Sequence, residues 1–344
     1  MPSIIRRLAA GAALTAAALP GVAPAQPAAA PIPINIGLPI SNYWPAYIAR
    51  DLKLFEQVGL QPKFVSFTTG SPLIAGMKSG SLDVAWTGLA TLFMLGQNIP
   101  LKFVLVPLDS SSQMALVVNP NTGITSFKDI AKAKNIGAPT ATCAEVSMVM
   151  AARAAGTQRS ALKASNLAPN LLQTGLQNGQ IDSTFIWGPW NLTLRDAGYK
   201  IVSWDKDFMK DGGVCATTIA IRPEFLKEHP SVGCKLVKVQ ALALAAARRD
   251  PAHAIRTMQE AFNIPPAIAK ETYDTLLIPS IESQIEPDSP WTLSNKGAGL
   301  TEKLFVAGQA LLEAKAITTP IARETIAEAV DDRYIREFLK TDCK

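Results

Sequence analysis

Two glycine- and hydroxyl-containing segments of this chain are suited to holding an anion. Gly70-Ser71 precedes a segment with helical spacing, and Thr140 to Ala144, which contains Thr142 and Cys143, begins another. The first turn of a helix presents free backbone N–H groups at the positive end of the helix dipole, and anions bind there. For either segment alone, ordinary N-capping is the more economical explanation, because Ser and Thr stabilise a helix start by about 1 kcal/mol without a ligand.

Four tryptophans are candidates to line a small-molecule site. The candidates are Trp44, Trp86, Trp187 and Trp190, with Thr87 directly after Trp86. Aromatic rings bury apolar ligand surface and can hold a cation against their faces. Trp187 is the strongest candidate, because Pro189 suits a first helical position and would fix the turn that aims Trp187 inward. Trp86, in an apolar strand, is as well suited to filling a core.

Nucleophilic catalysis has little support in the sequence. The two histidines, His229 and His253, lie in polar segments, so a Cys–His or Ser–His pair would be hard to assemble. Cys143 is the best candidate nucleophile, in an exported enzyme acting on a pyrimidine or a small acid. We therefore expect a protein that is not an enzyme and that uses no cofactor.

The four cysteines fit an exported protein. Cys143, Cys215, Cys234 and Cys343 allow three complete pairings, and their spacing alone does not choose among them. None forms a CxxC pair, so neither a zinc site nor a thioredoxin-type redox site is indicated, and no metal is expected. In an oxidising compartment, one or two disulfides would act as structural cross-links.

The first twenty-five residues have the pattern of a secretory signal peptide. Arg6-Arg7 precede an apolar run from Leu8 to Leu19, and Ala23-Pro24-Ala25 is a small-x-small cleavage site. An uncleaved anchor is the alternative, but a membrane span needs about 20 apolar residues and Pro20 interrupts this run. We expect cleavage after Ala25 and export of the mature chain.

Length, composition and net charge indicate a globular protein of two domains. A mature chain of about 320 residues suits two domains, and an apolar fraction of 48% can build their cores. The net charge of +5 falls to about +3 without Arg6 and Arg7, and no basic block stands out. We therefore expect no nucleic-acid partner. No later apolar run approaches the length of a membrane span.

Strand-like and helix-like segments alternate over the first two thirds of the chain. Strands are expected at 34–38, 63–67, 82–86, 101–108, 114–118, 135–138, 183–186 and 217–221. Helices are expected at 44–55, 71–79, 144–155, 170–178 and 189–197, with a further one capped by Ser126. This alternation favours parallel α/β sheets with helices on their faces.

Beyond residue 221 only helices are expected. Each has an apolar face that must pack against another element, and a sheet can provide it. They span 232–249, 252–262, 265–275 and 296–314 and carry apolar residues at helical spacing. We therefore expect the chain to cross into a second domain near Val117 and to return near Ala220. The first lobe would comprise 26–116 and 221–344, and the second lobe 117–220. A ligand cleft would lie between them, and the two crossing strands would be the hinge.

Short motifs spread over most of the mature chain form an ordered set. In the first lobe they are Trp44–Tyr47, Leu54–Glu56, Gly59-Leu60, Gly70-Ser71, Ser79–Trp86 and Ala115–Val118. The others are Asn135–Pro139, Asn178–Asp182, Trp187–Trp190 and Ile219–Phe225. In order and spacing, the set resembles the substrate-binding proteins of bacterial ABC importers for taurine, aliphatic sulfonates, nitrate and thiamine-precursor pyrimidines. These are type II periplasmic binding proteins.

The resemblance implies a fold, a location and partners. It implies a two-lobed α/β fold in which each lobe is a mainly parallel sheet flanked by helices. It implies a periplasmic monomer that captures a small polar ligand by hinge closure and delivers it to an ABC transporter permease in the inner membrane. In the family pattern, Cys143 and Cys215 both fall near ligand-facing loops, so their pairing is one alternative. Cys234 and Cys343 would then pair or stay free.

The resemblance also assigns roles at the site, with departures that bear on the ligand. Gly70-Ser71 and Thr142-Cys143 would orient a polar head, and Trp187, Trp190 and Trp44 would cover an apolar part. Taurine binders usually carry Ser-Thr-Thr-His where this chain reads Thr142 to Glu145, and an ammonium-binding aspartate where it has Thr217.

Three hypotheses for the function remain when the resemblance and these departures are taken together. A taurine-like sulfonate is the favoured ligand. A cationic or heteroaromatic amine is the alternative, with Glu145 as the replacement acid, although Glu145 also suits the helix dipole. An exported enzyme using Cys143 is the second alternative.

Overall fold

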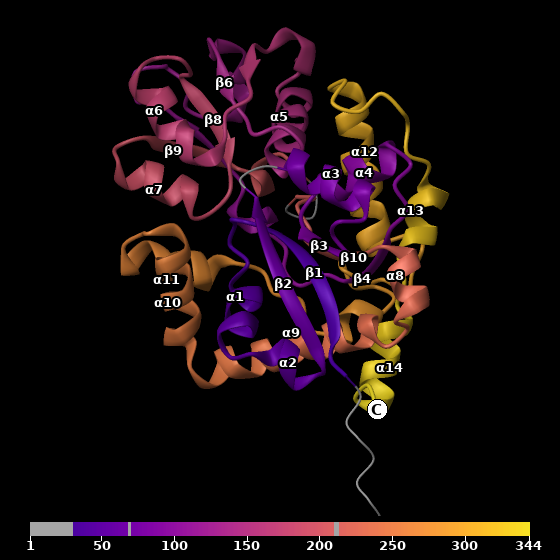
Figure 1. The fold of residues 1–344 in the computed structure, drawn as a ribbon. Coiled ribbons are helices and arrows are strands. Elements are labelled where there is room, and N and C mark those ends of the chain that lie inside the picture. Colours follow the sequence, from indigo (N-terminus) through magenta and orange to yellow (C-terminus); the bar gives the residue numbers. More distant parts are fainter. Residues whose placement is uncertain (1–29, 68–69, 210–212) are drawn as a thin grey trace, which may run out of the picture. The chain divides into compact units, whose positions relative to one another are not determined.

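Two five-stranded sheets organise the chain in the computed structural model (Figure 1). The structure describes residues 30–67, 70–209 and 213–344, and residues 31–344 form one unit. The expected signal peptide, 1–25, lies outside the described residues. No helix of the described part is both long enough and apolar enough to cross a bilayer.

The first sheet has the strand order β2-β1-β3-β10-β4. Its strands are β1 (Ile32–Pro39), β2 (Leu60–Phe67), β3 (Val84–Thr87), β4 (Lys102–Leu105) and β10 (Thr218–Ile221). β1 pairs in parallel with β2 and β3, whereas β10 runs antiparallel between β3 and β4. We call this sheet with its helices the first lobe.

The second sheet, with its helices, forms the second lobe and has the order β7-β6-β8-β5-β9. Its strands are β5 (Ala115–Val118), β6 (Ile136–Gly137), β7 (Ala164–Ser165), β8 (Ser183–Ile186) and β9 (Lys200–Trp204). β6 is parallel to β7 and β8, and β5 is antiparallel to β8 and β9. Each sheet is therefore mixed: three parallel strands are joined by an inner strand that enters from the other lobe and runs antiparallel to both of its neighbours.

The chain passes between the sheets twice, and we call the described residues of these two links, 106–114 and 205–209 with 213–217, the crossing segments. Short 3-10 turns, η1 (Ser111–Gln113) and η5 (Asp205–Asp207), lie within them. The change of sheet thus precedes Ala115 and follows Trp204, slightly earlier than the sequence expectation at Val117 and Ala220. β5 and β10 each lie wholly within one sheet, so no strand among the described residues continues from one sheet into the other.

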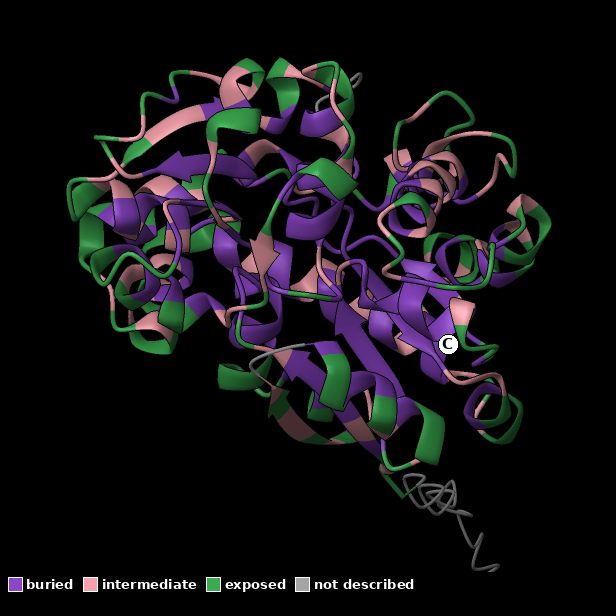
Figure 2. Ribbon diagram, turned by 90° about the horizontal axis from the view of Figure 1, so that it is seen from above, coloured by how far each residue is buried: buried purple, intermediate pink, exposed green. Residues whose placement is uncertain are grey.

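Helices cover both sheets, and their buried faces adjoin the strands (Figure 2). In the first lobe they are α1 (Trp44–Asp51), α2 (Leu54–Gln57), α3 (Gly70–Ser79), α4 (Ala90–Gly96), α8 (Pro223–Glu228), α9 (Val232–Arg249), α10 (Pro251–Phe262), α11 (Pro266–Thr275), α12 (Gly299–Glu313), α13 (Arg323–Ala329) and α14 (Arg333–Thr341). The second lobe has α5 (Cys143–Ala154), α6 (Leu172–Gln177), α7 (Trp190–Asp196) and the 3-10 turns η2 (Phe127–Lys132), η3 (Arg159–Ala161) and η4 (Pro169–Leu171).

Local backbone geometry accounts for two features of these helices. The single helix expected over 44–55 is divided into α1 and α2, because Lys53 takes a left-handed conformation with φ of 53°. Gly37 allows α3 to lie close to β1, since a Cβ there would clash with Leu73 Cδ1. The start of α3 is thereby held near the carboxyl end of β1.

Two disulfides cross-link the described chain. Cys143, at the start of α5, is bonded to Cys215 in the second crossing segment. Cys234, in α9, is bonded to Cys343 beyond α14. The first bond ties the second lobe to a crossing segment, and the second fastens the end of the chain to the first lobe.

Candidate functional site

The candidate ligand site is a cavity of about 50 Å³ to which both lobes and both crossing segments contribute. The first lobe contributes Pro39, Ile40, Ser41, Tyr43, Gly70, Thr87, Gly88, Leu89 and Ala90. The second lobe and the crossing segments contribute Ala141, Thr142, Cys143, Trp187, Ser110, Cys215 and Thr217. Most of these residues lie at or just beyond the carboxyl ends of β1, β2, β3, β6 and β8, where ligands bind in open α/β sheets, and Ser110, Cys215 and Thr217 come from the crossing segments.

Tyr43 is the titratable side chain of this lining. Its buried hydroxyl lies beside the side chains of Ser41, Thr87 and Thr217 and the backbone of Gly88. Burial raises the pKa of the phenol, and these hydrogen-bonding neighbours lower it by less. The group is therefore a neutral hydroxyl at physiological pH, able both to donate and to accept a hydrogen bond.

The turn that carries Tyr43 is tied to the rest of the molecule on both sides. Tyr47 donates its hydroxyl hydrogen to the backbone oxygen of Ser41 at 2.7 Å. Asn42 Nδ2 donates to Gln113 Oε1 at 2.7 Å, which links the turn to the first crossing segment. Sequence reasoning missed Ser41 and Tyr43, although a polar run directly after a predicted strand was the available signal.

The start of α5 is a capped helix N-terminus. Thr142 Oγ1 accepts a hydrogen bond from Ala144 N at 3.2 Å and donates to the Pro139 oxygen at 2.7 Å. Ala141, the preceding residue, has a φ of 59°, which is rarely adopted by residues other than glycine. Thr142 therefore acts as an N-cap and also lines the cavity.

The two lobes approach each other closely around the cavity. A Cβ on Gly70 would lie 3.0 Å from the Ala141 oxygen and 3.2 Å from Ala90 Cβ. A Cβ on Gly88 would lie 3.4 Å from Cys143 Sγ. The starts of α3 and α5 thus meet with no room for a larger side chain, as expected of two lobes closed over a small site.

The described lining of the cavity carries no acidic or basic side chain. Its polar groups are the indole N–H of Trp187, unpartnered within the described residues, the backbone groups at the starts of α3 and α5, and hydroxyls from Ser41, Tyr43, Ser110, Thr87, Thr142 and Thr217. Such groups can hold an anion through neutral donors at positive helix ends. No cluster of His, Cys, Asp or Glu among the described residues is arranged to hold a metal ion.

The structure brings part of the sequence-predicted set together. Gly70, Thr87, Thr142, Cys143, Trp187 and Thr217 all line the cavity. Trp86 is fully buried in the core, because side chains alternate along β3 and Thr87 takes the cavity side. Trp44 is 3% exposed, and its ring centroid lies 5.2 Å from that of Tyr273.

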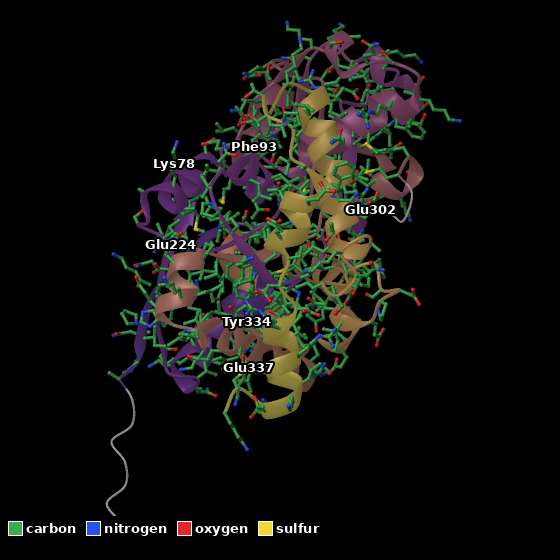
Figure 3. The ribbon with its side chains drawn as sticks, turned by 90° about the vertical axis from the view of Figure 1, so that its right-hand side faces the viewer. Lys78, Phe93, Glu224, Glu302, Tyr334 and Glu337 are labelled. Atoms are coloured by element: carbon green, nitrogen blue, oxygen red, sulfur yellow. A yellow bond between two sulfur atoms is a disulfide. The ribbon has the colours of Figure 1, made fainter. Side chains whose placement is uncertain are left out.

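Glu145 and Ser71 lie outside the cavity, in a neighbouring groove of about 420 Å³. Lys78 and Phe93, on α3 and α4, also line this groove (Figure 3). Burial raises the pKa of Glu145, and the backbone of Ala141 and the charge of Arg159 lower it by less. The carboxyl that the sequence suggested as a replacement acid is therefore not part of the cavity lining.

Trp190 lies at a contact between the two lobes and does not line the cavity. Its ring meets that of Phe262 edge to face at 5.6 Å, which brings α7 of the second lobe against α10 of the first. Beside it, Arg195 on α7 donates to both carboxylate oxygens of Glu271 on α11, at 2.7 and 2.9 Å. This bidentate pair and the aromatic contact form one lobe–lobe interface, which we call the α7–α11 contact.

Gln113 connects the first crossing segment to both lobes. Its Nε2 donates to the Thr272 oxygen at 2.6 Å, and its Oε1 accepts from Asn42. Its backbone oxygen accepts from Asn191 Nδ2 at 2.6 Å. Gln113 is 2% exposed, so water has little access to these hydrogen bonds. Removing one partner would leave a buried polar group unsatisfied and would destabilise the folded protein.

Comparison with known sequences finds a matching family model and similar proteins. The family model described as NMT1/THI5 like matches residues 40–254. A putative binding protein of Brucella abortus is 27% identical over 213 residues, which cover 60% of this chain and 65% of that protein. A putative aliphatic sulfonates-binding protein of Bacillus subtilis is 26% identical over 189 residues, or 54% of this chain and 55% of that protein. The matches thus span less than two thirds of these relatives.

Comparison with solved structures confirms the two-lobed fold. The alkanesulfonate-binding protein SsuA of Xanthomonas axonopodis pv. citri, bound to MOPS, aligns with a TM-score of 0.71 at 18% identity, over 89% of this chain and all of that one. The periplasmic aliphatic sulphonate binding protein SsuA of Escherichia coli gives 0.70 at 15%, over 88% and 98%. The desulfurization enzyme DSZB gives 0.61 at 11%, over 90% and 99%. At these identities the likeness concerns the fold alone.

Proposed function

This chain belongs to the NMT1/THI5-like family, and we propose on that basis that it is the solute-binding component of a bacterial ABC importer for a sulfonate. The observation that carries the proposal is the cavity between the lobes, lined by hydroxyls and helix starts and by no charged side chain of the described residues. The names of the Bacillus and Xanthomonas proteins support a sulfonate as the ligand class.

Binding would be a matter of positioning and closure. The backbone N–H groups at the starts of α3 and α5, with the hydroxyls of Thr87 and Tyr43, would donate hydrogen bonds to the sulfonate oxygens. Trp187 and the Cys143–Cys215 disulfide would cover the rest of the ligand. The crossing segments would act as the hinge, because domain closure concentrates its dihedral changes in a few linking residues.

The cellular setting is part of the proposal. A cleaved signal peptide would export the chain to the periplasm, and two disulfides fit an oxidising compartment. There a monomer would deliver its ligand to a permease in the inner membrane. We assign the chain before residue 106 and after residue 217 to the first lobe, and residues 115–204 to the second.

An enzymatic role is less well supported. The alternative relies on Cys143 as a nucleophile, and only a thiolate can serve as one. Cys143 is bonded to Cys215, and the described residues include no free cysteine. The likeness to the enzyme DSZB is one of fold, and fold alone does not carry function.

Calorimetric titration and thermal shift with small alkanesulfonates, sulfate, nitrate and pyrimidines would test the proposal. A ligand at a hundredfold its Kd should add about 2.7 kcal/mol to the free energy of unfolding. Thr87→Val should weaken sulfonate binding about tenfold, because it removes a hydroxyl that would donate to a charged group. Thr301→Val, at another buried threonine outside the cavity, should leave binding unchanged. Binding of nitrate or a pyrimidine and of no sulfonate would contradict the proposal.

A further inference from the structure

The Cys143–Cys215 disulfide lies in a place that a purely structural cross-link would not require. Both half-cystines line the cavity between the lobes, one at the start of α5 and the other in the second crossing segment. The other disulfide, Cys234–Cys343, lies outside this lining. A disulfide is broken by an attacking thiolate, and the rate depends on whether the thiolate can reach a sulfur. A bond in the wall of a ligand cavity can be reached whenever the cavity opens.

The first lobe covers this bond in the structure. Cys143 and Cys215 are 5% and 4% exposed. A Cβ on Gly88, which directly follows β3 of the first lobe, would lie 3.4 Å from Cys143 Sγ, so the first lobe packs against the sulfur. A hinge motion that separates the lobes would remove this cover. The bond is therefore shielded from thiols when the lobes are closed and accessible when they are open.

The two sulfurs differ in what surrounds them. Cys143 is the first residue of α5, a helix of 12 residues whose N-cap is Thr142. The positive end of this helix would stabilise a Cys143 thiolate, and a stabilised thiolate is the better leaving group in exchange. The backbone of Cys215 is fixed, because its N donates to Ser111 Oγ at 2.9 Å and its oxygen accepts from Ser110 N at 3.0 Å. Breaking the bond would thus free the start of α5 while Cys215 stays in place.

We propose that Cys143–Cys215 is a site of thiol–disulfide exchange with an external dithiol, and that closure of the lobes over a ligand protects it. A thiolate of the dithiol attacks Cys215 Sγ, the bond between the two cysteines breaks, and Cys143 leaves as a thiolate that takes up a proton. The second thiol of the dithiol then attacks the mixed disulfide, and Cys215 leaves and is protonated in turn. The protein gains two electrons and two protons, and the dithiol is oxidised to its disulfide.

Exchange at this site would link the redox state of the protein to its affinity for ligand. Once the start of α5 is free, Thr142 and the backbone N–H groups there are no longer held in the cavity wall. Ser147 Oγ, further along α5, still donates to Asp205 Oδ2 at 2.9 Å, so the helix stays attached to the second crossing segment. The reduced protein is therefore folded but binds ligand more weakly. The inference rests on the lobe closure of the proposed function and is independent of which ligand binds.

The test follows the reduction of both disulfides in the mature protein by dithiothreitol. Samples are alkylated with iodoacetamide at timed intervals, and peptide mass spectrometry measures how much of each cysteine is reduced. Without ligand, Cys143–Cys215 should be reduced while circular dichroism shows the protein folded. Propane-1-sulfonate at a hundredfold its Kd should slow this reduction about a hundredfold, because only about one molecule in a hundred is then free to open. The rate at Cys234–Cys343 should not change.

The outcomes separate the exchange site from the proposed function. Resistance of Cys143–Cys215 to reduction in the folded, unliganded protein would overturn the inference, and so would an equal rate with propane-1-sulfonate bound. If calorimetry shows that neither propane-1-sulfonate nor another sulfonate binds, the sulfonate function is refuted. The rate without ligand still decides whether the bond is an exchange site.

Two further measurements check the direction of attack and its consequence. With glutathione, a monothiol, the trapped mixed disulfide should be on Cys215 and the free thiol on Cys143, and the reverse would contradict the assigned leaving group. Calorimetric titration in dithiothreitol should give an affinity for propane-1-sulfonate about tenfold below that of the oxidised protein. The double variant Cys234→Ser, Cys343→Ser, which retains only the cavity disulfide, should show the same decrease. Equal affinities of the oxidised and reduced protein would contradict the link between redox state and binding.

Discussion

At the scale of single residues, Asp205 is a buried acid whose pKa is raised on folding. It is 1% exposed, Ser147 donates to its Oδ2, and its Oδ1 has no partner among the described residues. Burial raises its pKa well above the usual value, and the charges of Asp109 and Asp207 raise it further. A group whose pKa is raised on folding contributes stability below its unfolded pKa of about 3.9, and loses it as the pH rises through the folded pKa.

The consequence is a measurable pH dependence of stability. The free energy of unfolding of the wild-type protein should fall, relative to that of Asp205→Asn, as the pH rises above the unfolded pKa of about 3.9. Chemical denaturation of both proteins at several pH values would measure this difference. Subtracting the two profiles removes the opposing effect of Asp331 and Asp332, whose pKa values are lowered. A difference that is independent of pH would mean that folding does not raise the pKa of Asp205.

Sequence reasoning found the cavity-lining residues that lie at helix starts, where a local pattern is recognisable. It missed residues that line the cavity only because of the direction in which their side chains point. Gly70, Thr142 and Cys143 stand at helix starts, so their types and positions predicted where their backbones would lie. Trp44 and Tyr43 are neighbours in sequence, but only the latter lines the cavity. No local pattern shows which of two adjacent aromatic rings turns toward a cavity and which packs on α11.

At the scale of elements, the Cys143–Cys215 disulfide holds the start of α5 to the second crossing segment. Both half-cystines line the cavity. Replacing the pair by Ser should lower the free energy of unfolding by about 4 kcal/mol, as loop-closure entropy predicts for a separation of 72 residues. It should also weaken ligand binding, because α5 would no longer be fixed against the crossing segment. Denaturant titration and calorimetry would measure the two effects.

The second disulfide is a matched control for the first. Cys234–Cys343 closes a longer loop of 109 residues, and it lies in α9 and beyond α14, outside the cavity lining. Replacing both by Ser should cost similar stability and leave ligand affinity unchanged at a temperature where the protein is folded. Equal losses of affinity in the two double variants would show that only global stability is involved.

Much of the element order could be predicted from the sequence, but strand direction could not. Apolar periodicity placed β8 and α9 where the structure has them. The alternation of strands and helices suggested parallel sheets, whereas β5 and β10 run antiparallel to their neighbours. Their direction is set by where the chain enters each sheet, which is a property of the whole connection. The same limit explains the missed β9, whose partner β5 lies far away in sequence.

At the scale of the whole molecule, ligand release depends on contacts that the lobes make directly. The Arg195–Glu271 pair, with Trp190 against Phe262, joins the lobes at the α7–α11 contact. The Arg195 and Glu271 side chains are 39% and 40% exposed, so water and salt screen the pair and its contribution is modest. Glu271 also holds the pKa of Arg195 above its usual value, which is consistent with a favourable pairing.

Removing this pair should favour opening of the lobes. Glu271→Gln should raise the ligand dissociation rate about two- to fivefold, which corresponds to about 0.5 to 1 kcal/mol for a screened ion pair. The effect should shrink at high salt, because mobile ions already weaken the pair in the wild-type protein. Asp196→Asn is the matched control: Asp196 contacts the same arginine at 2.9 Å but lies with it on α7, so its loss removes equal charge without releasing the lobes. Stopped-flow measurements of ligand release would distinguish the variants, and equal rates for both would mean that the α7–α11 contact persists when the lobes separate.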